Sequence, residues 1–514
     1  MGSLPDSKYI IKTDGYWFVE AHDVDSSKGY ITVSAKGIAN GLSNEPNDGA
    51  DFGPDTYNPN YTGSGIPYTQ TSGIQEAEEY GGENNIAIRI TGEFELGNTV
   101  VFKHSYQTII FDAVFIPTST VPLFEVQTIG FCSFLGTILV NDKNLITNSS
   151  AWVIDFSGFI YDSYIEKIQT QDVYNSVHFA QGNNNYFPSI NVFNGRGDGI
   201  LIDSTPTNNP YAINYGWHDN RYGSISLIGS SGSGYGITFN PNIDQTVGGN
   251  QISNIEALGW GGDGIILNGY QVEIWFGNVN CDSNGGNGFH LPSGHNVARI
   301  MISTLWCSSN GGKGLLLEAP NGSSSTSPVI VDFNVGIFYA HGNTGTSNGI
   351  QIENSEYVSF GVATSQNNSG QGVGLYNTSQ VYFGKLITYD NPYGGLEDNG
   401  SILTGNLTIG VLDVSDGISL TPTSLGYLKI GSTPQGATPS IPSVPASGTA
   451  QQNTNPYPVS VYLYGGTVTV IDYTPSGGSA TQVGSVTPMT VRLNPGDSIT
   501  LTYSAAPTWN WVAV

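Results

Sequence analysis

Two aspartates of this 514-residue chain stand at the same place in a recurring phrase. Asp198 and Asp263 each precede the second glycine of a Gly-Asp-Gly-Ile run. If each copy of the phrase belongs to one coil of a stacked structure, and Tyr235 fills the coil between them, the two positions lie about 10 Å apart. Carboxylates near this separation hydrolyse glycosidic bonds with inversion. Asp and Asn before glycine are also common turn formers, and this alternative stays open.

Further side chains capable of acid–base chemistry follow within a short stretch. Asp282 lies in the next turn, and His295 and Arg299 come just after it. We therefore predict a catalytic set of Asp198, Asp263, Asp282, His295 and Arg299. Glu256 falls in the same part of the repeat as Asp282. His290 alternates with Phe289 and Leu291, so we expect it to point outward into solvent rather than to serve as a ligand. The chain shows no Asp-x-Asp cluster of the calcium-binding kind, so we predict no metal and no cofactor.

Aromatic residues recur near the turns of the same region. Exposed rings in a shallow groove stack on sugar rings, and the predicted carbohydrate-binding residues are Trp260, Tyr235, Tyr270 and Trp306. Ordinary packing of loops against the body of the protein is the alternative explanation.

The phrase itself is a repeat, and it predicts the architecture that positions these residues. Its key glycines are Gly199, Gly236, Gly264, Gly288, Gly314, Gly349 and Gly372. Apolar residues stand one and three positions after each glycine, as in Ile265 and Leu267, so they share one face of a short strand. Asn284, Asn310 and Asn368 share a position four residues before their glycines, which predicts a ladder of side-chain amides between coils. Cys281 and Cys307 also share a position, and we expect stacked core residues there rather than a disulfide. A repeat of this length indicates a solenoid.

The segments on either side of the repeat differ from it. Ser72 to Tyr80 is predicted to be a helix, with Ser72 as its N-cap and Gly81-Gly82 as its end. Strands are predicted over 86–90, 99–102 and 108–111. Residues 431–457 are rich in Pro, Ser and Thr and indicate a linker. Five short strands with glycine turns over 459–512 then predict a small antiparallel β-sandwich.

Composition excludes several classes of protein. Only 11% of the residues are charged and the net charge is −26, so no basic surface is available for nucleic acid. No apolar run approaches the length of a membrane span, and no signal peptide is evident at the N-terminus. Sequons stand at Asn60, Asn148, Asn321, Asn367, Asn377, Asn399 and Asn406, and would mark exposed loops if they were glycosylated.

These features resemble known families. Asp48-Gly49-Ala50, the helix at Gly73–Ala77 and the strands after Asn84 resemble the entrance of pectate-lyase-like right-handed parallel β-helices. The run 444–450, followed by 462–468, resembles terminal modules of phage tail and virion fibre proteins. Polygalacturonases of the same superfold use clustered aspartates, then Gly-His-Gly and Arg-Ile-Lys. Here Asp263, Asp282, Gly294-His295 and Arg299-Ile300 follow that order, but the Asp-Asp pair is absent and Asn296 and Met301 depart from the pattern.

We therefore predict an all-β protein in four parts: an N-terminal segment with a helix-capped entrance (1–98), a right-handed parallel β-helix (99–430), a linker (431–457) and a β-sandwich (458–514). The resemblances imply a virion surface appendage, such as a tail spike, or a turret or fibre protein of a thermophilic archaeal virus. Such a protein would lie on the virion surface, bind host-surface glycans, contact other virion proteins and form a homo-oligomer. The alternative is a polysaccharide-degrading enzyme, an inverting hydrolase or a lyase, on a virion or secreted.

Overall fold

The computed structural model describes residues 9–11, 17–19, 29–35, 50–53, 69–119, 122–143, 146, 151–203, 216–230, 232, 234–240, 247–269, 271–292, 297–318, 330–345, 347–353, 355–376, 378–398, 406–419, 427–430, 441–455 and 458–513. The chain divides into two compact units, Met1–Thr408 with Asp413–Leu428, and Ile409–Leu412 with Lys429–Val514. The first unit is a parallel β-solenoid and the second contains antiparallel sheets, as the sequence predicts.

One side of the solenoid, here named the long-strand face, consists of long parallel strands that each pair with the equivalent strand of the next coil. Its strands are β3 (Tyr30–Ser34), β4 (Ala87–Leu96), β6 (Thr108–Pro117), β9 (Ser133–Asn141), β11 (Tyr164–Gln171), β13 (Tyr186–Gly195), β16 (Arg221–Gly229), β19 (Gln251–Leu258), β21 (Gln271–Asp282), β23 (Val297–Ser308), β25 (Ile330–His341), β27 (Ser355–Gln366), β29 (Ser379–Tyr389), β31 (Asn406–Val414) and β33 (Tyr427–Ile430).

A second side, the short-strand face, carries the strands that follow the glycine phrase. Its members are β5 (Val100–Phe102), β7 (Phe124–Val126), β10 (Trp152–Tyr161), β12 (Asn175–Asn183), β14 (Ile200–Ile202), β17 (Ile237–Phe239), β20 (Ile265–Leu267), β22 (Phe289–Leu291), β24 (Leu315–Leu317), β26 (Ile350–Glu353), β28 (Val373–Tyr376), β30 (Leu396–Asp398) and β32 (Ile418–Ser419).

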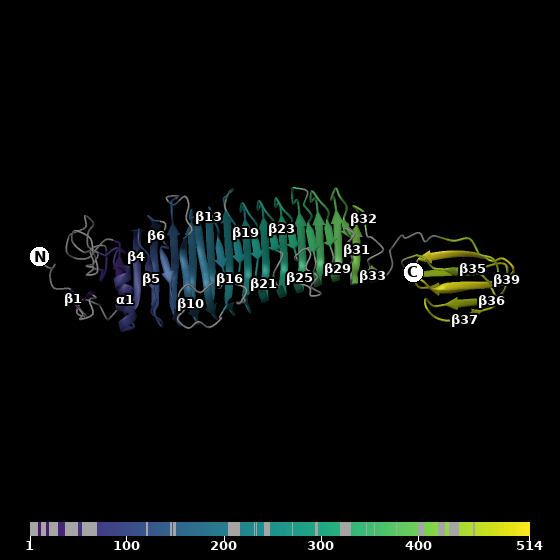
Figure 1. The fold of residues 1–514 in the computed structure, drawn as a ribbon, viewed down its shortest axis with the longest axis horizontal. Coiled ribbons are helices and arrows are strands. Elements are labelled where there is room, and N and C mark those ends of the chain that lie inside the picture. The colour runs from purple at the N-terminus through teal and green to yellow at the C-terminus, as the bar shows by residue number, and fades with distance from the viewer. Residues whose placement is uncertain are drawn as a thin grey trace. The chain divides into compact units, whose positions relative to one another are not determined.

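A narrow third side, the linking face, joins the other two. It contains β8 (Ile129–Gly130), β15 (Trp217–His218) and β18 (Val247–Gly248), together with the ends of β10 and β12 and the beginnings of the later long strands. Figure 1 shows the strands stacked edge to edge along the solenoid from β4 to β33. Matching residues of adjacent coils are therefore about 4.8 Å apart.

The interior consists of apolar columns, as the alternation in the repeat predicts. Ile200 pairs with Ile237, Ile237 with Ile265, and Ile265 with Phe289, and each is at most 1% exposed. Each fully buried side chain of this size contributes about 1.5–3 kcal/mol. Cys281 and Cys307 occupy another inward column as paired, buried, free cysteines, which confirms that prediction.

The asparagine ladder is confirmed, and it is longer than the sequence predicts. Each Asn side-chain oxygen accepts from the backbone N–H and the side-chain amide of the Asn in the preceding coil, in the order Asn284, Asn310, Asn343, Asn368, Asn391. Asp416 ends the ladder by accepting from Asn391. A second ladder joins Asn185, Asn220 and Asn250 at another corner. Both ladders satisfy buried backbone groups at turns, which the strands leave without partners.

The helix at the entrance is correctly predicted, but its ends are not. α1 spans Ile74–Asn84, and Ser72 does not cap it, because Gly73 occupies the N-cap in a left-handed conformation without a side-chain cap bond. Thr71 Oγ1 instead accepts the Gln75 N–H at 3.2 Å. The predicted stop at Gly81-Gly82 is wrong, because both glycines lie within the helix. Gly82 allows close packing, since a Cβ there would lie 2.1 Å from Cγ of His104. Upstream, β1 (Tyr9–Ile11) and β2 (Trp17–Val19) form an antiparallel pair.

The second unit contains the predicted sandwich. One sheet has the order β34 (Ala450–Gln452), β39 (Ser498–Ala505), β36 (Thr467–Thr474), β37 (Thr481–Gly484), and the other β38 (Met489–Leu493), β35 (Val459–Tyr464), β40 (Thr508–Ala513). Val461, Ile471, Leu501 and Trp511 are among the residues of its buried core. β34 lies inside the segment 431–457 that the sequence assigns to a linker.

Candidate functional site

A groove of about 490 Å³ crosses the outer surface of the long-strand face, where β16, β19, β21 and β23 lie side by side. One row of its side chains carries only hydroxyl and amide groups: Ser224, Asn254, Asn278 and Thr304. A second row holds Glu256, Asn280 and Trp306. Asp282 completes the polar lining at the end of β21, and the strands at Ile225, Ile255 and Val279, whose side chains point into the core, lie beneath the groove.

Two carboxylates of the groove stand on neighbouring strands. Glu256 is opposite Asn280, and Asp282 is opposite Leu258, so the two acids are diagonal neighbours on one face. With about 4.8 Å between parallel strands and about 3.3 Å per residue along them, such neighbours have Cα atoms about 8 Å apart. Ser226 Oγ lies 2.5 Å from Glu256 Oε1, and Ser283 Oγ lies 2.9 Å from Asp282 Oδ1. Both carboxylates are half-buried and line the same groove.

The end of the groove toward β25 is aromatic. Trp306 is 43% exposed, and its ring packs on that of Tyr339, with the ring centroids 4.1 Å apart at 33°. The indole Nε1–H donates to Ser308 Oγ at 2.8 Å, and the Tyr339 hydroxyl contacts the side-chain amide of Gln366. These contacts fix the Trp306 ring, which leaves one aromatic surface available for a ligand. Of the three predicted carbohydrate-binding residues that the structure describes, Trp306 lines this groove.

Asp198 and Asp263 lie where the repeat places them, and both bind the backbone of the following coil. The strand registers put Tyr235 in the coil between them. Asp198 Oδ1 accepts the Tyr235 N–H at 2.9 Å, and Asp263 Oδ1 accepts the Asn287 N–H at 2.5 Å. Asn287 Oδ1 in turn accepts the Lys313 N–H at 2.8 Å. Asp and Asn at this position therefore satisfy turn backbone groups.

His290 faces outward, as predicted, but it is not solvated. Its imidazole joins three coils, with Nδ1 2.5 Å from Asp263 Oδ2 and Nε2 3.4 Å from Glu318 Oε2. The side chain is 14% exposed. Burial alone would lower the pKa of His290, but the two carboxylates outweigh it and raise the pKa to about 9. The prediction of a solvated residue is wrong because the two acids enclose the ring.

A matching cluster that the sequence reasoning missed lies nearer the N-terminus on the same face. His178 Nδ1 is 2.8 Å from Asp155 Oδ1, and Nε2 is 2.9 Å from Asp203 Oδ1. Burial disfavours the imidazolium, but the two carboxylates raise the pKa of His178 to about 9. The available signal was the run Val177-His178-Phe179, which matches Phe289-His290-Leu291 in its alternation. Each cluster is a cation between two anions that fastens neighbouring coils.

The remaining predicted catalytic residues do not meet at one site. Arg299 is exposed and forms an ion pair with Glu273, which lies near the opposite end of β21 from Asp282. Arg299 also has a positive φ of 57°, at a bend of the strand. His295 lies outside the described residues, as does Tyr270 of the carbohydrate-binding set.

Trp260 and Tyr235, the other two described residues of the predicted carbohydrate-binding set, differ in how exposed they are. Trp260 is 1% exposed and donates its Nε1–H to the Leu227 carbonyl at 3.1 Å. Its ring fills space left by glycines, since a Cβ on Gly195 would lie 2.5 Å from the indole. The carbohydrate-binding role predicted for Trp260 is therefore wrong, because the ring is in the core. Tyr235 is 43% exposed at the short-strand turn, away from the groove residues.

One group among the described residues has the composition of a metal site. The ligand atoms of Glu78, Glu79 and His104 lie within 4.8 Å of one another. Glu78 Oε1 already accepts the Lys103 N–H at 2.9 Å, and the Lys103 ammonium pairs with Glu79. A lysine thus already supplies the positive charge at this cluster. The described residues contain no helix that is long and apolar enough to cross a membrane.

Comparisons with known proteins give a fold resemblance. Neither a protein family nor a curated protein matches the sequence. Among solved structures, the Dettilon tailspike protein is 14% identical with a TM-score of 0.39, over 86% of this chain and 77% of that one. Tailspike protein 2 of bacteriophage CBA120 (enzymatically active domain) is 9% identical with a TM-score of 0.36, over 86% of this chain and 67% of that one. The Acinetobacter phage vB_ApiP_P1 tailspike protein is 11% identical with a TM-score of 0.30, over 97% and 93%. At this level of similarity, the fold assignment rests on the strand registers described above.

Proposed function

We propose that the groove on the long-strand face binds a glycan of a host surface, and that the chain is a surface appendage protein of a virion. The observation that carries the glycan part is the composition of the groove: a row of hydroxyls and amides, two carboxylates and the fixed ring of Trp306. Amides and carboxylates exchange hydrogen bonds with sugar hydroxyls, while an indole face packs on a sugar ring. Side chains held on paired strands keep their spacing better than side chains on loops.

The proposed place on a virion rests on two sequence resemblances. The solenoid entrance resembles that of pectate-lyase-like β-helices, and the C-terminal module resembles terminal modules of phage tail and virion fibre proteins. In this proposal the chain acts at the virion surface, contacts other virion proteins and forms a homo-oligomer. A turret or fibre protein of a thermophilic archaeal virus is the more specific form of the same proposal.

The test is retention of the purified protein on host-surface polysaccharides, comparing Trp306→Ala with Tyr393→Ala. Both residues are exposed aromatics, but Tyr393 lies outside the groove. We expect Trp306→Ala to weaken retention about tenfold or more, as for a central aromatic contact, and Tyr393→Ala to leave it unchanged. Equal retention of the two variants, or no retention of the unmodified protein on any host polysaccharide, would contradict glycan binding in this groove.

The diagonal pair Glu256 and Asp282 supports hydrolysis of the bound glycan as a second candidate function. One carboxyl group would protonate the leaving oxygen while the other activates water. Release of reducing ends by the unmodified protein, lost at least about a hundredfold in Glu256→Gln and in Asp282→Asn but kept in Tyr393→Ala, which lies outside the groove, would establish it. Loss of release in Asp263→Asn alone would instead place the chemistry at the short-strand turns, with Asp198.

A further inference from the structure

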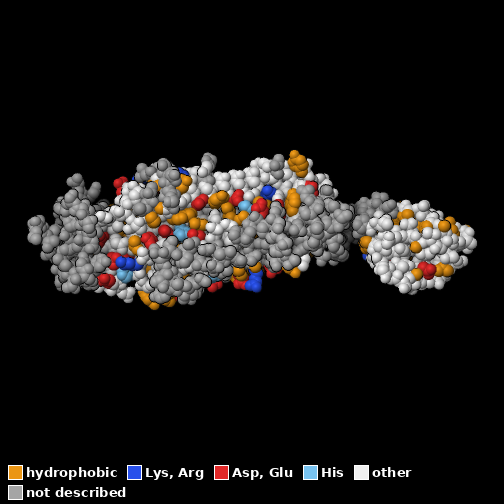
Figure 2. All heavy atoms as spheres, viewed as in Figure 1, with side chains coloured by type: hydrophobic (Ala, Val, Ile, Leu, Met, Phe, Trp, Pro, Cys, Tyr) orange, Lys and Arg blue, Asp and Glu red, His pale blue; other side chains and the backbone are white. Residues whose placement is uncertain are grey.

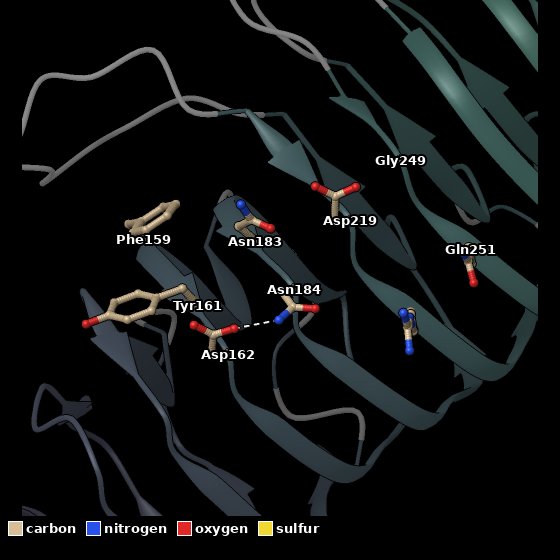
Figure 3. Close-up of a pocket in the computed structure, with 9 residues that line it drawn as sticks. Phe159, Tyr161, Asp162, Asn183, Asn184, Asp219, Gly249 and Gln251 are labelled. Carbon is tan, nitrogen blue, oxygen red and sulfur yellow. Dashed lines mark hydrogen bonds between the residues drawn. The ribbon is translucent and has the colours of Figure 1, made fainter.

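A second depression, of about 610 Å³, lies at the corner between the linking face and the long-strand face (Figure 3). A smaller one of about 360 Å³ adjoins it and shares Asn184, Arg221 and Gln251 with it. Arg221 and Gln251 are the first residues of β16 and β19, the same two strands whose later residues line the groove.

The corner depression has an aromatic wall that its neighbours hold in place. The Tyr161 ring packs on Phe159, with centroids 5.5 Å apart at 23°, and meets the edge of Phe131 at 5.5 Å. Figure 3 shows Phe159 and Tyr161 together on one side of the depression, with Gln251 across from them. A ring fixed in this way loses little freedom when it packs against a ligand.

Acidic side chains and an arginine surround this aromatic wall. Asp162 Oδ1 accepts from Asn184 Nδ2 at 2.5 Å, and Asp219 lies exposed beside them. Asp162 and Asp219 both have positive φ angles, of 49° and 56°, which Asp tolerates better than most residues. That tolerance explains an Asp at each corner, but it does not explain an arginine at the start of β16. Among the described residues the Arg221 guanidinium has no ion-pair partner, and its exposed side chain lines the depression.

Among the described residues, those on β16 and β19 that lie at the surface between the corner depression and the groove have small side chains. The corner positions of β16 and β19 are Gly223 and Ser253. Gly223 has no room for a side chain, because a Cβ would lie 2.4 Å from the Pro188 carbonyl oxygen. From Arg221 to Ser226 the strand advances about 17 Å at 3.3 Å per residue. The two hollows are thus successive parts of one surface, separated only by a low corner.

We propose that the corner depression is a second subsite for the same ligand, and that this ligand is an extended, neutral polysaccharide chain that crosses the strands from β16 to β23, from Arg221 past Glu256 to Trp306. The inference rests on the proposed glycan binding. Among its described lining residues, the track carries the acids Asp162, Asp219, Glu256 and Asp282 and one cation, Arg221, so it disfavours uronate polymers. On the described part of the surface in view in Figure 2, Lys and Arg side chains are isolated from one another.

The test compares Arg221→Ala with Arg299→Ala, a second exposed arginine at a bend of a long strand. The probes are neutral glucan, mannan, galactan and N-acetylglucosamine polymers and one polygalacturonate, each as short oligomers and as long chains. We expect long neutral chains to bind more tightly than short ones. Arg221→Ala should weaken long-chain binding about tenfold or more, and Arg299→Ala should leave it unchanged. Trp306→Ala should weaken both chain lengths.

The remaining outcomes contradict different parts of the two proposals. Equal long-chain binding by Arg221→Ala and Arg299→Ala, with Trp306→Ala still impaired, would overturn the corner subsite and leave the proposed groove intact. Binding of polygalacturonate in preference to every neutral polymer would overturn the neutral ligand. No effect of Trp306→Ala, or no binding of any probe, would overturn the proposed function and this inference with it. Thermal unfolding of each variant checks that the exposed substitutions leave the solenoid folded.

Discussion

Asn310 stands in the middle of the longer asparagine ladder, and its replacement by alanine should destabilise the solenoid by about 2–4 kcal/mol. Its Oδ1 accepts the Asn284 N–H at 3.1 Å and the Asn284 amide at 3.0 Å. Its Nδ2 donates to the Cys281 carbonyl at 3.1 Å and to Asn343 Oδ1 at 3.0 Å. Alanine removes all four bonds and leaves the Asn284 N–H buried without its acceptor. One orphaned donor costs about 1–3 kcal/mol, and the partly compensated partners add to it.

The neighbouring groups limit the size of the effect. Asn284 Nδ2 also donates to the Ala257 carbonyl, and Asn343 Oδ1 also accepts the Asn310 backbone N–H, so these groups keep a partner. Asn310→Asp should be at least as harmful as alanine, because the carboxylate cannot donate and would be buried at a position that is 0% exposed. Asp416 is tolerated at the end of the ladder, where it only accepts and is half-buried.

Urea unfolding followed by circular dichroism measures the change, and hydrogen exchange of peptides over 283–288 locates it. Asn278→Ala is the matched control, because Asn278 is an exposed asparagine whose one bond, to Asn254, lies on the outer surface. We expect Asn278→Ala to change stability by less than about 0.5 kcal/mol. If Asn310→Ala unfolded at the same urea concentration as Asn278→Ala, and the turn kept its protection, the ladder would not be what holds the coils at this corner.

Three further predictions concern charge, backbone packing and the core. Because the pKa of folded His178 is raised to about 9 from an ordinary 6.5, its contribution to stability is complete below about pH 6.5, falls as the pH rises and is lost above about pH 9. Unfolding free energies from pH 6 to 10 should show this decline, and His178→Gln should reduce it to the part contributed by other histidines such as His290, whose pKa is also raised to about 9; an unchanged pH profile in that variant would contradict the assignment. Gly277→Ala should cost about 1–3 kcal/mol, because its Cβ would lie 2.2 Å from the Ser253 carbonyl oxygen. Ser253→Ala, at the exposed position of the preceding coil, is the control, and equal melting temperatures would count against the clash. Trp260→Ala should lower stability by about 3–5 kcal/mol, and a variant that kept its melting temperature but lost glycan retention would restore the binding role for this ring.

The sequence predicts the fold well because the key glycine of each repeat marks equivalent positions in successive coils. Once the copies are aligned on their glycines, alternation separates inward from outward residues, as at Ile265 and Leu267. The ladder member Asn343 escaped this alignment because the turn before Gly349 is longer than the others. The burial of Trp260 escaped it for another reason: the space for its ring comes from glycines of earlier coils, Gly195 and Gly199, which are remote in sequence. Contacts of this kind depend on how coils stack, which no single copy of the repeat encodes.

The location of the candidate site follows from a difference between the short-strand turns and the long strands: side chains at the turns already have hydrogen-bond partners in the protein. At the short-strand turns the backbone leaves groups unpaired, and acids there are engaged by them: both oxygens of Asp263 have partners, one in backbone and amide bonds and the other at His290. In the middle of a long strand the neighbouring coils satisfy the backbone, so outward side chains such as Glu256 and Trp306 remain available for a ligand. Under the proposed function, the carboxylates available to a glycan are therefore those on strands, and Asp282, at the end of β21, is the described member of the predicted catalytic set that lines the groove.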